Sequence, residues 1–255
     1  MTNNKRVLIL GGTADAAALT AQIDRIEGVD TIASFAGRTQ QRNQVSQGNR
    51  VSIRRGGFGG ATGLANYLRS EQIDLLIDAT HPFAAQISFN AAEAASQCGI
   101  GRLMLIRPPW EAQPGDKWIE VESHQEAANI LPGLAQRIFL TIGRQEIPAY
   151  SHLKNIWFLM RMIDSPDANT PVPPGKLLWE KGPFSYEEER ALLQQYEIGV
   201  IVSKNSGGDA TYPKIIAARE LGLPVVMIKR PPNPGGEQVA DVNSALAWLE
   251  KNSCC

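Results

Sequence analysis

A repeated segment is the feature that most constrains the fold of this chain. AASQCGIGRLMLIRPP (94–109) aligns without a gap on AARELGLPVVMIKRPP (217–232). Each copy has the pattern of a helix end, a glycine that stops the helix, a short apolar strand and then Arg-Pro-Pro. Helices that lead into buried strands are typical of parallel sheets covered on both faces. The repeat therefore predicts two tandem α/β domains of similar topology.

Three shorter matches occur in the same order in both halves. AGR (36–38) matches IGR (142–144), GGF (56–58) matches GPF (182–184), and IDLLIDATH (73–81) matches IGVIVSKNS (198–206). Parallel α/β units resemble one another in any case, but the order of these matches favours duplication. RPPWEAQPG (107–115) lies between the halves and is rich in proline, which is typical of a linker. We therefore expect one domain over residues 1–113 and a second over residues 114–255.

Short apolar runs predict the strands, and longer amphipathic or alanine-rich segments predict the helices. In the first half, strands are expected at 6–10, 31–35, 51–54, 74–78 and 103–106, and helices at 14–26, 62–69 and 83–98. In the second half, strands are expected at 118–121, 137–141, 156–161, 198–202 and 225–228, and helices at 124–131, 185–195 and 212–221. The predicted fold class is α/β with mainly parallel sheets flanked by helices.

Composition excludes several classes of function. The net charge is −1 and the pI about 6.3, so there is no basic surface to bind nucleic acid. The chain has no apolar run of about eighteen residues, so we expect no contact with a membrane. It begins with a strand pattern rather than a signal peptide. Cys98, Cys254 and Cys255 fit neither a disulfide framework nor a zinc site. These observations predict a cytoplasmic protein without a bound metal.

The first predicted strand ends in Gly11-Gly12-Thr13 and a helix follows. Glycines let a ligand approach the backbone, and the N-terminus of a helix favours phosphate. The match to the dinucleotide fingerprint G-x-G-x-x-G is partial, since the two glycines are adjacent. A tight turn without a ligand is the alternative.

The end of the second predicted strand indicates which dinucleotide is bound. NAD sites usually place an acid here for the ribose hydroxyls, but this segment contains no acid and carries Arg38 and Thr39 instead. A guanidinium and a hydroxyl suit a ribose 2′-phosphate, which favours NADPH over NADH. The alternative is that Arg38 is a solvated surface side chain.

Two further segments of the first domain are expected to line the cofactor site. Gly56, Gly57 and Phe58 follow the third strand, where glycines make room for a flat ligand or form a mobile loop. Thr80, His81 and Pro82 follow the fourth strand. In open parallel sheets, ligands bind beside the carboxyl ends of the strands. His81 could donate a proton, orient the ligand or serve only the structure.

Basic residues of the second domain lie near predicted strand ends and helix starts. Together they predict a cationic wall suited to a ligand with several carboxylates; they are Arg144, Lys181, Lys204, Lys214 and Arg230. This domain has VESHQEA (121–127) after its first predicted strand, where the first domain has Gly-Gly-Thr. We therefore expect the nucleotide in the first domain and the other reactant in the second.

Tyr150 and Lys154 form a Y-x-x-x-K pair like that of short-chain dehydrogenases. That pair has to share a long helix, but Pro148 precedes it and a strand pattern follows at once. We therefore reject this assignment.

The motifs taken together resemble those of precorrin-6A reductases, the NADPH-dependent enzymes of cobalamin biosynthesis. The resemblance spans roughly residues 7–231 and is carried by LILGGTADAAAL, FAGRT, GGFGG, DATHPFA, IGR, KGPFSYEEE, VSKNSGG and AARELGLPVVMIKRP, in this order. The chain departs from the family pattern at Asp15, where glutamate is expected, and in a poorly matched insert at 165–175.

This resemblance implies two Rossmann-like domains around a cleft that holds the active site. It implies that NADPH delivers hydride to a ring double bond of precorrin-6A, giving precorrin-6B, with no need for a metal or a flavin. The macrocycle's acetate and propionate carboxylates would match the cationic wall. The residues expected to bind this tetrapyrrole are Arg144, Lys181, Lys204, Asn205, Ser206, Gly207, Gly208 and Lys214.

Hydride addition also requires a proton on the neighbouring carbon. We expect Lys204 or His81 to supply it, with Tyr212 or water behind them, although Lys204 could instead only bind a carboxylate. The protein is expected to act as a monomer. Two other functions remain open: an NAD(P)H-dependent reductase or dehydrogenase of another small molecule, and a non-catalytic module that senses NADPH.

Overall fold

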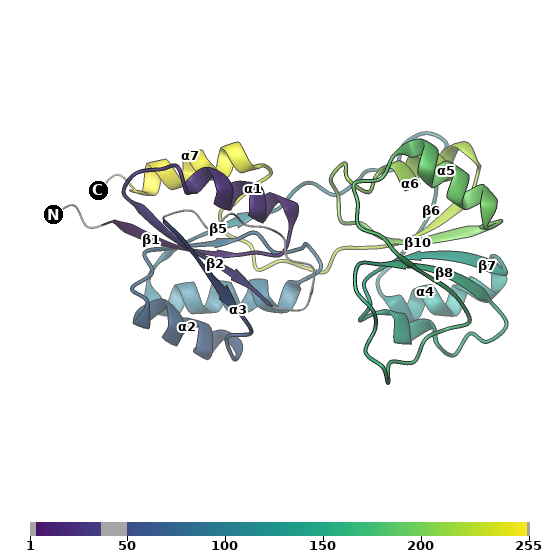
Figure 1. Cartoon of the computed structure of the whole chain (residues 1–255), viewed down its shortest axis with the longest axis horizontal. Helices are drawn as coiled ribbons and strands as arrows, with labels where there is room; N and C mark the ends of the chain where they lie inside the picture. Colours follow the sequence, from purple (N-terminus) through teal and green to yellow (C-terminus); the bar gives the residue numbers. More distant parts are fainter. Residues whose placement is uncertain (1–3, 37–49, 254–255) are drawn as a thin grey trace. The chain divides into compact units, whose positions relative to one another are not determined.

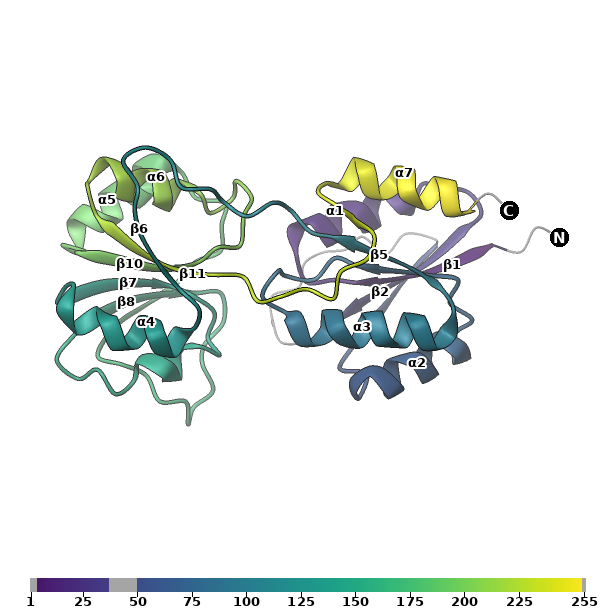
Figure 2. The same cartoon turned by 180° about the vertical axis from the view of Figure 1, so that it is seen from behind.

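The computed structural model describes residues 4–36 and 50–253 and divides the chain into two compact units (Figures 1 and 2). The second unit is the continuous segment Pro109–Arg230, and the first contains the residues on both sides of it. Each unit contains a six-stranded sheet in which all described strand pairs are parallel. The predicted fold class is therefore confirmed.

The first unit is a sheet with two helices on each face. Its strands are β1 (Lys5–Leu10), β2 (Val29–Phe35), β3 (Val51–Arg55), β4 (Leu75–Asp78), β5 (Gly101–Leu105) and β12 (Gln238–Val239). Its helices are α1 (Ala14–Ile23), α2 (Gly60–Ser70), α3 (Ala85–Cys98) and α7 (Val242–Ser253). Helices α1 and α7 cover one face, and α2 and α3 cover the other (Figure 1).

The second unit repeats this plan with shorter helices. Its strands are β6 (Lys117–Val121), β7 (Arg137–Thr141), β8 (Trp157–Met162), β9 (Gly175–Trp179), β10 (Val200–Lys204) and β11 (Pro224–Ile228). Its helices are α4 (His124–Ile130), α5 (Tyr186–Gln195) and α6 (Pro213–Glu220), with 3₁₀ turns η1 (Leu131–Gly133) and η2 (Ile147–Tyr150). Helices α5 and α6 lie on the face opposite α4 (Figure 2).

The two sheets have the same strand order. The first is ordered β12-β5-β4-β1-β2-β3 and the second β6-β11-β10-β7-β8-β9. The first five strands of the first unit follow the order 3-2-1-4-5 of dinucleotide-binding domains, with β12 in the sixth place. The register agrees as well, since Asp78 pairs with Met104 in one sheet and Ser203 pairs with Met227 in the other. The predicted duplication is therefore visible in topology and register.

The sixth strand of each sheet comes from the segment that follows the other unit's fifth strand. Strand β5 leads through the first Arg-Pro-Pro to β6, which pairs with β11. Strand β11 leads through the second Arg-Pro-Pro to β12, which pairs with β5. The helices after β6 and β12 begin alike: Ser123 and Asp241 each accept a hydrogen bond from the amide three residues ahead, which is typical of N-caps.

This topology changes two predictions. The boundary at residue 113 and the assignment of everything after it to the second domain differ from the observed division, because residues from Pro231 onward complete the first sheet. The match of AGR to IGR is also misplaced. IGR follows β7, the central strand that corresponds to β1, so Ile142-Gly143-Arg144 is the counterpart of Gly11-Gly12-Thr13.

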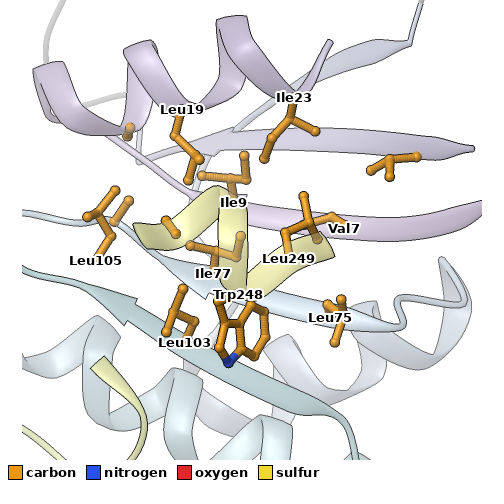
Figure 3. Close-up of a cluster of buried hydrophobic side chains, with 14 residues drawn as sticks. Val7, Ile9, Leu19, Ile23, Leu75, Ile77, Leu103, Leu105, Trp248 and Leu249 are labelled. Atoms are coloured by element: carbon orange, nitrogen blue, oxygen red, sulfur yellow. The ribbon is translucent and has the colours of Figure 1, made fainter. Parts of the chain in front are cut away.

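The core of the first unit shows why β12 and α7 belong to it. Val7, Ile9 and Ile77 point from the central strands into a cluster with Leu19 of α1 (Figure 3). Helix α7 closes this cluster with side chains that are almost fully buried: Ala245, Trp248 and Leu249. Burying a side chain of this size contributes about 1.5–3 kcal/mol, so the C-terminal helix is integral to the unit.

No helix in the part of the chain that the structure describes is long and apolar enough to cross a membrane.

Candidate functional site

The glycine turn of the first unit lies between β1 and α1. The Gly11 amide donates to the Ser34 carbonyl oxygen at 2.9 Å, which brings the turn against the end of β2. Gly12 has φ +129°, a conformation that residues with a side chain rarely adopt. Thr13 caps α1, since its hydroxyl accepts from the Ala16 amide at 3.0 Å. The turn therefore presents bare backbone at the N-terminus of a helix.

Thr13 also connects this turn to the end of β4. Its hydroxyl donates to the Ala79 carbonyl oxygen at 2.8 Å. Strand order reverses between β1 and β4, and such a reversal is where parallel sheets hold ligands. The structure thus brings the predicted Gly11–Thr13 turn and the predicted segment Thr80–Pro82 to one end of the sheet. Asp15, in the first turn of α1, forms an ion pair with Arg107 at 3.0 Å, which offsets a negative charge near this helix end.

The segment after β4 is held by the buried side chain of Asp78. One carboxylate oxygen accepts from the Thr80 amide at 3.1 Å and from its hydroxyl at 2.7 Å. His81 is half-buried, and its Nδ1 accepts from the Phe83 amide at 3.2 Å. That acceptor role places the proton of a neutral His81 on Nε2. Pro82 is half-buried in the turn that leads to α3.

The Gly56–Phe58 loop is organised by Arg54, a residue that sequence reasoning missed. Its guanidinium donates to the carbonyl oxygens of Gly56 at 2.6 Å and Gly57 at 2.7 Å. It also lies 3.7 Å from the centre of the Phe58 ring. The run of two arginines before two glycines was the available signal. Arg38 and Thr39, the predicted 2′-phosphate ligands, lie outside the described residues.

Lys204 is the last residue of β10, the strand of the second unit that corresponds to β4. Its ammonium lies 3.2 Å from a carboxylate oxygen of Glu146, and only 14% of its side chain is exposed. The Glu146 side chain folds back over the turn after β7. Its other carboxylate oxygen lies so close to Gly143 that a Cβ added at that glycine would be 2.8 Å from it. Next to the turn that corresponds to Gly11–Thr13, the second unit thus has the ammonium of Lys204 and the carboxylate of Glu146. Sequence reasoning missed Glu146.

His124 and Tyr150 adjoin this pair. Sequence reasoning missed His124 and considered Tyr150 only as part of the Y-x-x-x-K pair. Their Nδ1 and hydroxyl atoms are 3.0 Å apart, and Tyr150 is fully buried. Burial lowers the pKa of His124 to about 4, with Glu146 opposing and Lys204 reinforcing the change. Burial, reinforced by Glu146, raises the pKa of Tyr150. Tyr150 ends a 3₁₀ turn rather than lying on a long helix, which confirms the rejection of the Y-x-x-x-K assignment.

Asn205 and Gly208 form hydrogen bonds with Trp110 of the linker. The Asn205 side chain accepts from the Trp110 amide at 2.8 Å and donates to the Trp110 carbonyl at 2.9 Å. The Trp110 indole donates to the Gly208 carbonyl at 2.9 Å. Between Asn205 and Gly208, the Ser206 amide donates a hydrogen bond to the Lys204 carbonyl oxygen at 2.8 Å, and Gly207 has φ +67°. This loop therefore holds the connecting segment next to Lys204.

The remaining predicted residues of the second unit differ in exposure. Arg144 donates to the Ser165 carbonyl oxygen at 3.0 Å, and Lys181 is exposed. Arg230 donates to the Asn205 carbonyl oxygen at 2.7 Å. The Tyr212 hydroxyl accepts from Arg219 at 2.9 Å, and its ring lies beside Trp110, so its contacts are those of a packing residue.

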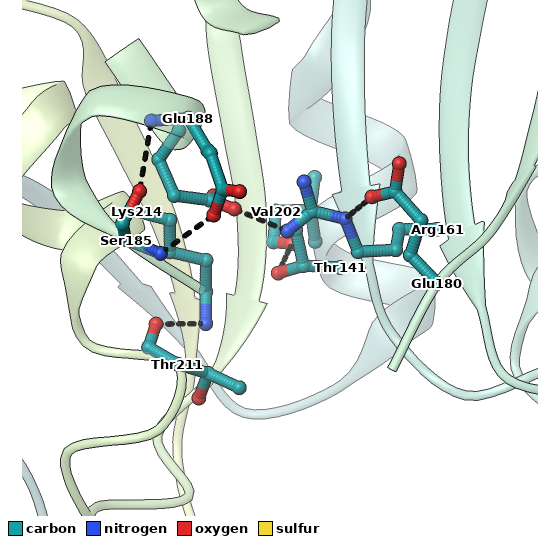
Figure 4. A network of polar contacts seen from close by, with 9 residues as sticks. Thr141, Arg161, Glu180, Ser185, Glu188, Val202, Thr211 and Lys214 are labelled. Carbon is teal, nitrogen blue, oxygen red and sulfur yellow. Dashed lines mark hydrogen bonds and ion pairs between the residues drawn. The ribbon is translucent and has the colours of Figure 1, made fainter. Parts of the chain in front are cut away.

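Lys214 does not belong to a cationic wall, contrary to the prediction. It is only 5% exposed and donates to the Thr211 carbonyl oxygen at 2.9 Å (Figure 4). The same buried region contains Arg161, which pairs with Glu180 at 2.9 Å and with the buried Glu189. A lysine at a helix start is usually solvated, so the sequence carried no sign of this burial.

Lys214 should make the stability of the second unit depend on pH. Burial lowers its pKa from 10.5 to about 7, with Glu189 opposing and Arg161 reinforcing the shift. The unfolded chain therefore holds more protons between pH 7 and 10.5, so stability increases as pH rises through this window. We expect a gain of about 1 kcal/mol per pH unit between pH 7 and 9, measured by urea denaturation. Lys214→Met should remove this slope, and an unchanged slope in that variant would contradict the assignment.

No group of three or more side chains that could hold a metal ion is found among the residues that the structure describes.

Comparisons with known proteins agree on one family. The sequence model of the family described as precorrin-6x reductase CbiJ/CobK matches residues 6–250. A precorrin-6A reductase of Rhodococcus erythropolis is 48% identical over 96% of this chain and 97% of its own. One of Rhodobacter capsulatus is 39% identical, covering 96% and 95% of the two chains. A cobalt-precorrin-6A reductase of Methanothermobacter thermautotrophicus is 30% identical, covering 96% and 83%.

A solved structure has the same fold over nearly the whole chain. The structure described as CobK precorrin-6A reductase superimposes with a TM-score of 0.88 at 39% identity. The match covers 97% of each chain. Both six-stranded sheets therefore have counterparts in that protein.

Proposed function

The chain belongs to the precorrin-6x reductase CbiJ/CobK family, and from this premise we propose that its first unit binds NADPH and its second unit binds precorrin-6A. The reduction of precorrin-6A in cobalamin biosynthesis is an oxidoreductase reaction. Relatives that act on the metal-free substrate are 39–48% identical, against 26–30% for the cobalt-precorrin enzymes. This difference favours the metal-free tetrapyrrole.

The first unit suits a dinucleotide because the Gly11–Thr13 turn leaves room for a ligand to approach the backbone. A Cβ added at Gly12 would meet no atom of the described residues within 4 Å. The N-terminus of α1, capped by Thr13, favours a pyrophosphate there. The open backbone at Gly12 is the observation that carries this half of the proposal. When bound, NADPH supplies the hydride, and the turn, Thr80 and His81 orient it and exclude water.

The second unit suits an anionic reactant. Lys204 and Arg144 stand at the ends of the two central strands, and Lys181 follows β9. The Lys204 ammonium is partly buried beside the Glu146 carboxylate. A substrate carboxylate that binds there therefore meets this ammonium in a partly buried environment. Charge-assisted hydrogen bonds are strong in such places. We assign Lys204 to carboxylate binding, and it remains with His81 as a candidate for supplying the proton.

The reaction is tested by following NADPH absorbance with precorrin-6A present. Oxidation of NADPH together with a spectral change of the tetrapyrrole supports the proposal. Binding of NADPH without turnover would favour a sensing module, and turnover only with another small molecule would favour a different reductase. The monomeric state and the cytoplasmic location stay predictions, which sedimentation and cell fractionation can test.

Arg38→Ala should raise the KM for NADPH about 10- to 100-fold and leave the KM for NADH unchanged. The variant loses a charge-assisted contact to the 2′-phosphate, which contributes about 1.5–3 kcal/mol. Arg25→Ala, which removes an exposed arginine after α1, serves as the control and should change neither value. An equal KM for NADPH in the Arg38 variant and its parent would show that Arg38 does not bind the cofactor.

A further inference from the structure

Gly12 and Gly143 occupy the same position in the two units. The strands before them correspond in order and register, and each glycine lies two residues beyond the end of its strand. A Cβ added at Gly12 would meet no atom of the described residues within 4 Å, whereas one added at Gly143 would lie 2.8 Å from a carboxylate oxygen of Glu146. The space that the first unit leaves open is therefore taken, in the second unit, by a carboxylate of the protein itself.

The Glu146 carboxylate is held in this space from two directions. Its other oxygen lies 3.2 Å from the Lys204 ammonium at the end of β10. The backbone of Glu146 is fixed by the turn and by η2, because its amide donates to the Gly143 carbonyl oxygen and its carbonyl oxygen accepts from the Ala149 amide, each at 3.2 Å. The ion pair thus lies at the carboxyl ends of β7 and β10, the two central strands that pair with each other.

His124 and Tyr150 adjoin the ion pair without adding charge to it. Burial lowers the pKa of His124 to about 4, so its ring is neutral at pH 7. Burial, reinforced by Glu146, raises the pKa of Tyr150, so its hydroxyl keeps its proton. Among these four side chains, the Lys204 ammonium is therefore the positive charge that faces the Glu146 carboxylate.

A carboxylate in this position orders the lysine before a ligand arrives. Lysine has a long flexible stem, and fixing that stem when a ligand binds has an entropic cost. A lysine that is already held in one geometry binds its ligand without most of this cost. The Glu146 charge also repels an anionic ligand, but its side chain is 28% exposed, and water screens repulsion over a longer distance more than it weakens a direct contact.

We propose that Glu146 is a positioning residue: its carboxylate holds the Lys204 ammonium at the end of β10 for a carboxylate of precorrin-6A, and Gly143 leaves the space that this carboxylate needs. The proposal rests on the proposed function and adds to it a residue that acts through Lys204. Glu146 itself does not bind the substrate in this assignment.

Gly143→Ala tests the positioning because it displaces the carboxylate and removes neither charge. The added Cβ would be too close to the Glu146 oxygen, at 2.8 Å, but at an ordinary contact distance of 3.8 Å from the Lys204 ammonium. In steady-state kinetics, Gly143→Ala and Glu146→Gln should each raise the KM for precorrin-6A about 5- to 20-fold, with kcat within about twofold and the KM for NADPH unchanged. Glu146→Asp, which keeps the charge on a shorter stem, should lie between Glu146→Gln and the parent.

Two matched controls lie in the same unit. Gly133→Ala adds the same methyl group where a Cβ would meet no atom of the described residues within 4 Å. Glu122→Gln removes the carboxylate of an exposed ion pair with Lys229. Both should keep the KM of the parent.

A double-mutant cycle separates positioning from a structural role. In the Lys204→Met background, Glu146→Gln should change the KM for precorrin-6A by less than about twofold, because no ammonium is left to position. A residue that only supports the fold would produce the same change in both backgrounds. Urea denaturation of each variant checks that the folded fraction is unchanged.

The outcomes that overturn the proposal are distinct. A KM for precorrin-6A that stays at the parent's value in Glu146→Gln shows that Lys204 needs no positioning, and a lower KM shows that Glu146 competes with the substrate for the ammonium. Additive effects in the cycle assign Glu146 to the fold alone. If the parent does not oxidise NADPH with precorrin-6A, the proposed function itself fails and this assignment fails with it, which differs from an active parent whose variants match it.

Discussion

Arg161→Met lowers the free energy of unfolding of the second unit by about 3–5 kcal/mol, which is the expected cost of leaving a buried charge without its partner. Arg161 is 8% exposed and pairs with Glu189, which is 1% exposed. Its guanidinium also lies 3.9 Å from the centre of the Phe184 ring. Burial already raises the pKa of Glu189, and Arg161 opposes that rise. Removing Arg161 therefore leaves a carboxylate that must take up a proton or unfold its surroundings.

Urea denaturation followed by tryptophan fluorescence measures this loss, because four of the five tryptophans lie in the second unit. Arg161→Met with Glu189→Leu should recover most of the stability, since it removes both charges together. Arg137→Met is the matched control, because this arginine stacks on Trp157 without a buried carboxylate partner in the described contacts. A loss in Arg161→Met no larger than in the control would show that the buried pair contributes little.

Lys204→Met lowers kcat/KM for precorrin-6A by about 10²–10³-fold, the second large effect that we expect. The variant loses the proposed contact to a substrate carboxylate and leaves Glu146 without its ammonium at 3.2 Å. Truncating one member of a buried charge pair costs about 2–5 kcal/mol, and the middle of that range corresponds to a change of this size. Stopped-flow or steady-state rates of NADPH oxidation measure it.

Lys204→Arg separates binding from proton transfer. A guanidinium keeps the charge but does not titrate near neutral pH, so retained turnover argues against proton donation by this side chain. Lys229→Met, which removes an exposed lysine paired with Glu122 after β11, should leave the rate unchanged. A rate in Lys204→Met within about threefold of the parent would exclude Lys204 from the site.

Most of the fold could be predicted from the sequence because the central strands are short apolar runs separated by helical patterns. Every predicted strand and helix is present, with ends that shift by a few residues. Strands β9 and β12 and helix α7 were not predicted. Strand β12 has only two residues, and β9 carries exposed positions at both ends, so neither produces a clear apolar run. The pairing of β12 with β5 depends on contacts between residues far apart in the chain, which local patterns do not encode.

The site was predictable where glycine or strand position specifies the geometry. Gly12, Thr13 and Lys204 stand at strand ends as expected. Lys214 was misjudged because its burial depends on α5 packing against α6, which places Glu189 nearby. Glu146 was missed because only folding brings its carboxylate over Gly143 and onto Lys204.

The place of β12 and α7 has a consequence for the order in which the protein matures on the ribosome. All the strands of the second unit lie between Pro109 and Arg230, so its sheet can form before translation ends. The first unit, although its chain emerges earlier, keeps one sheet edge and the face beneath Trp248 uncovered until β12 and α7 have been synthesised. The half that is synthesised first is therefore the half that is completed last, and a nascent chain halted near residue 230 displays an apolar surface that chaperones bind.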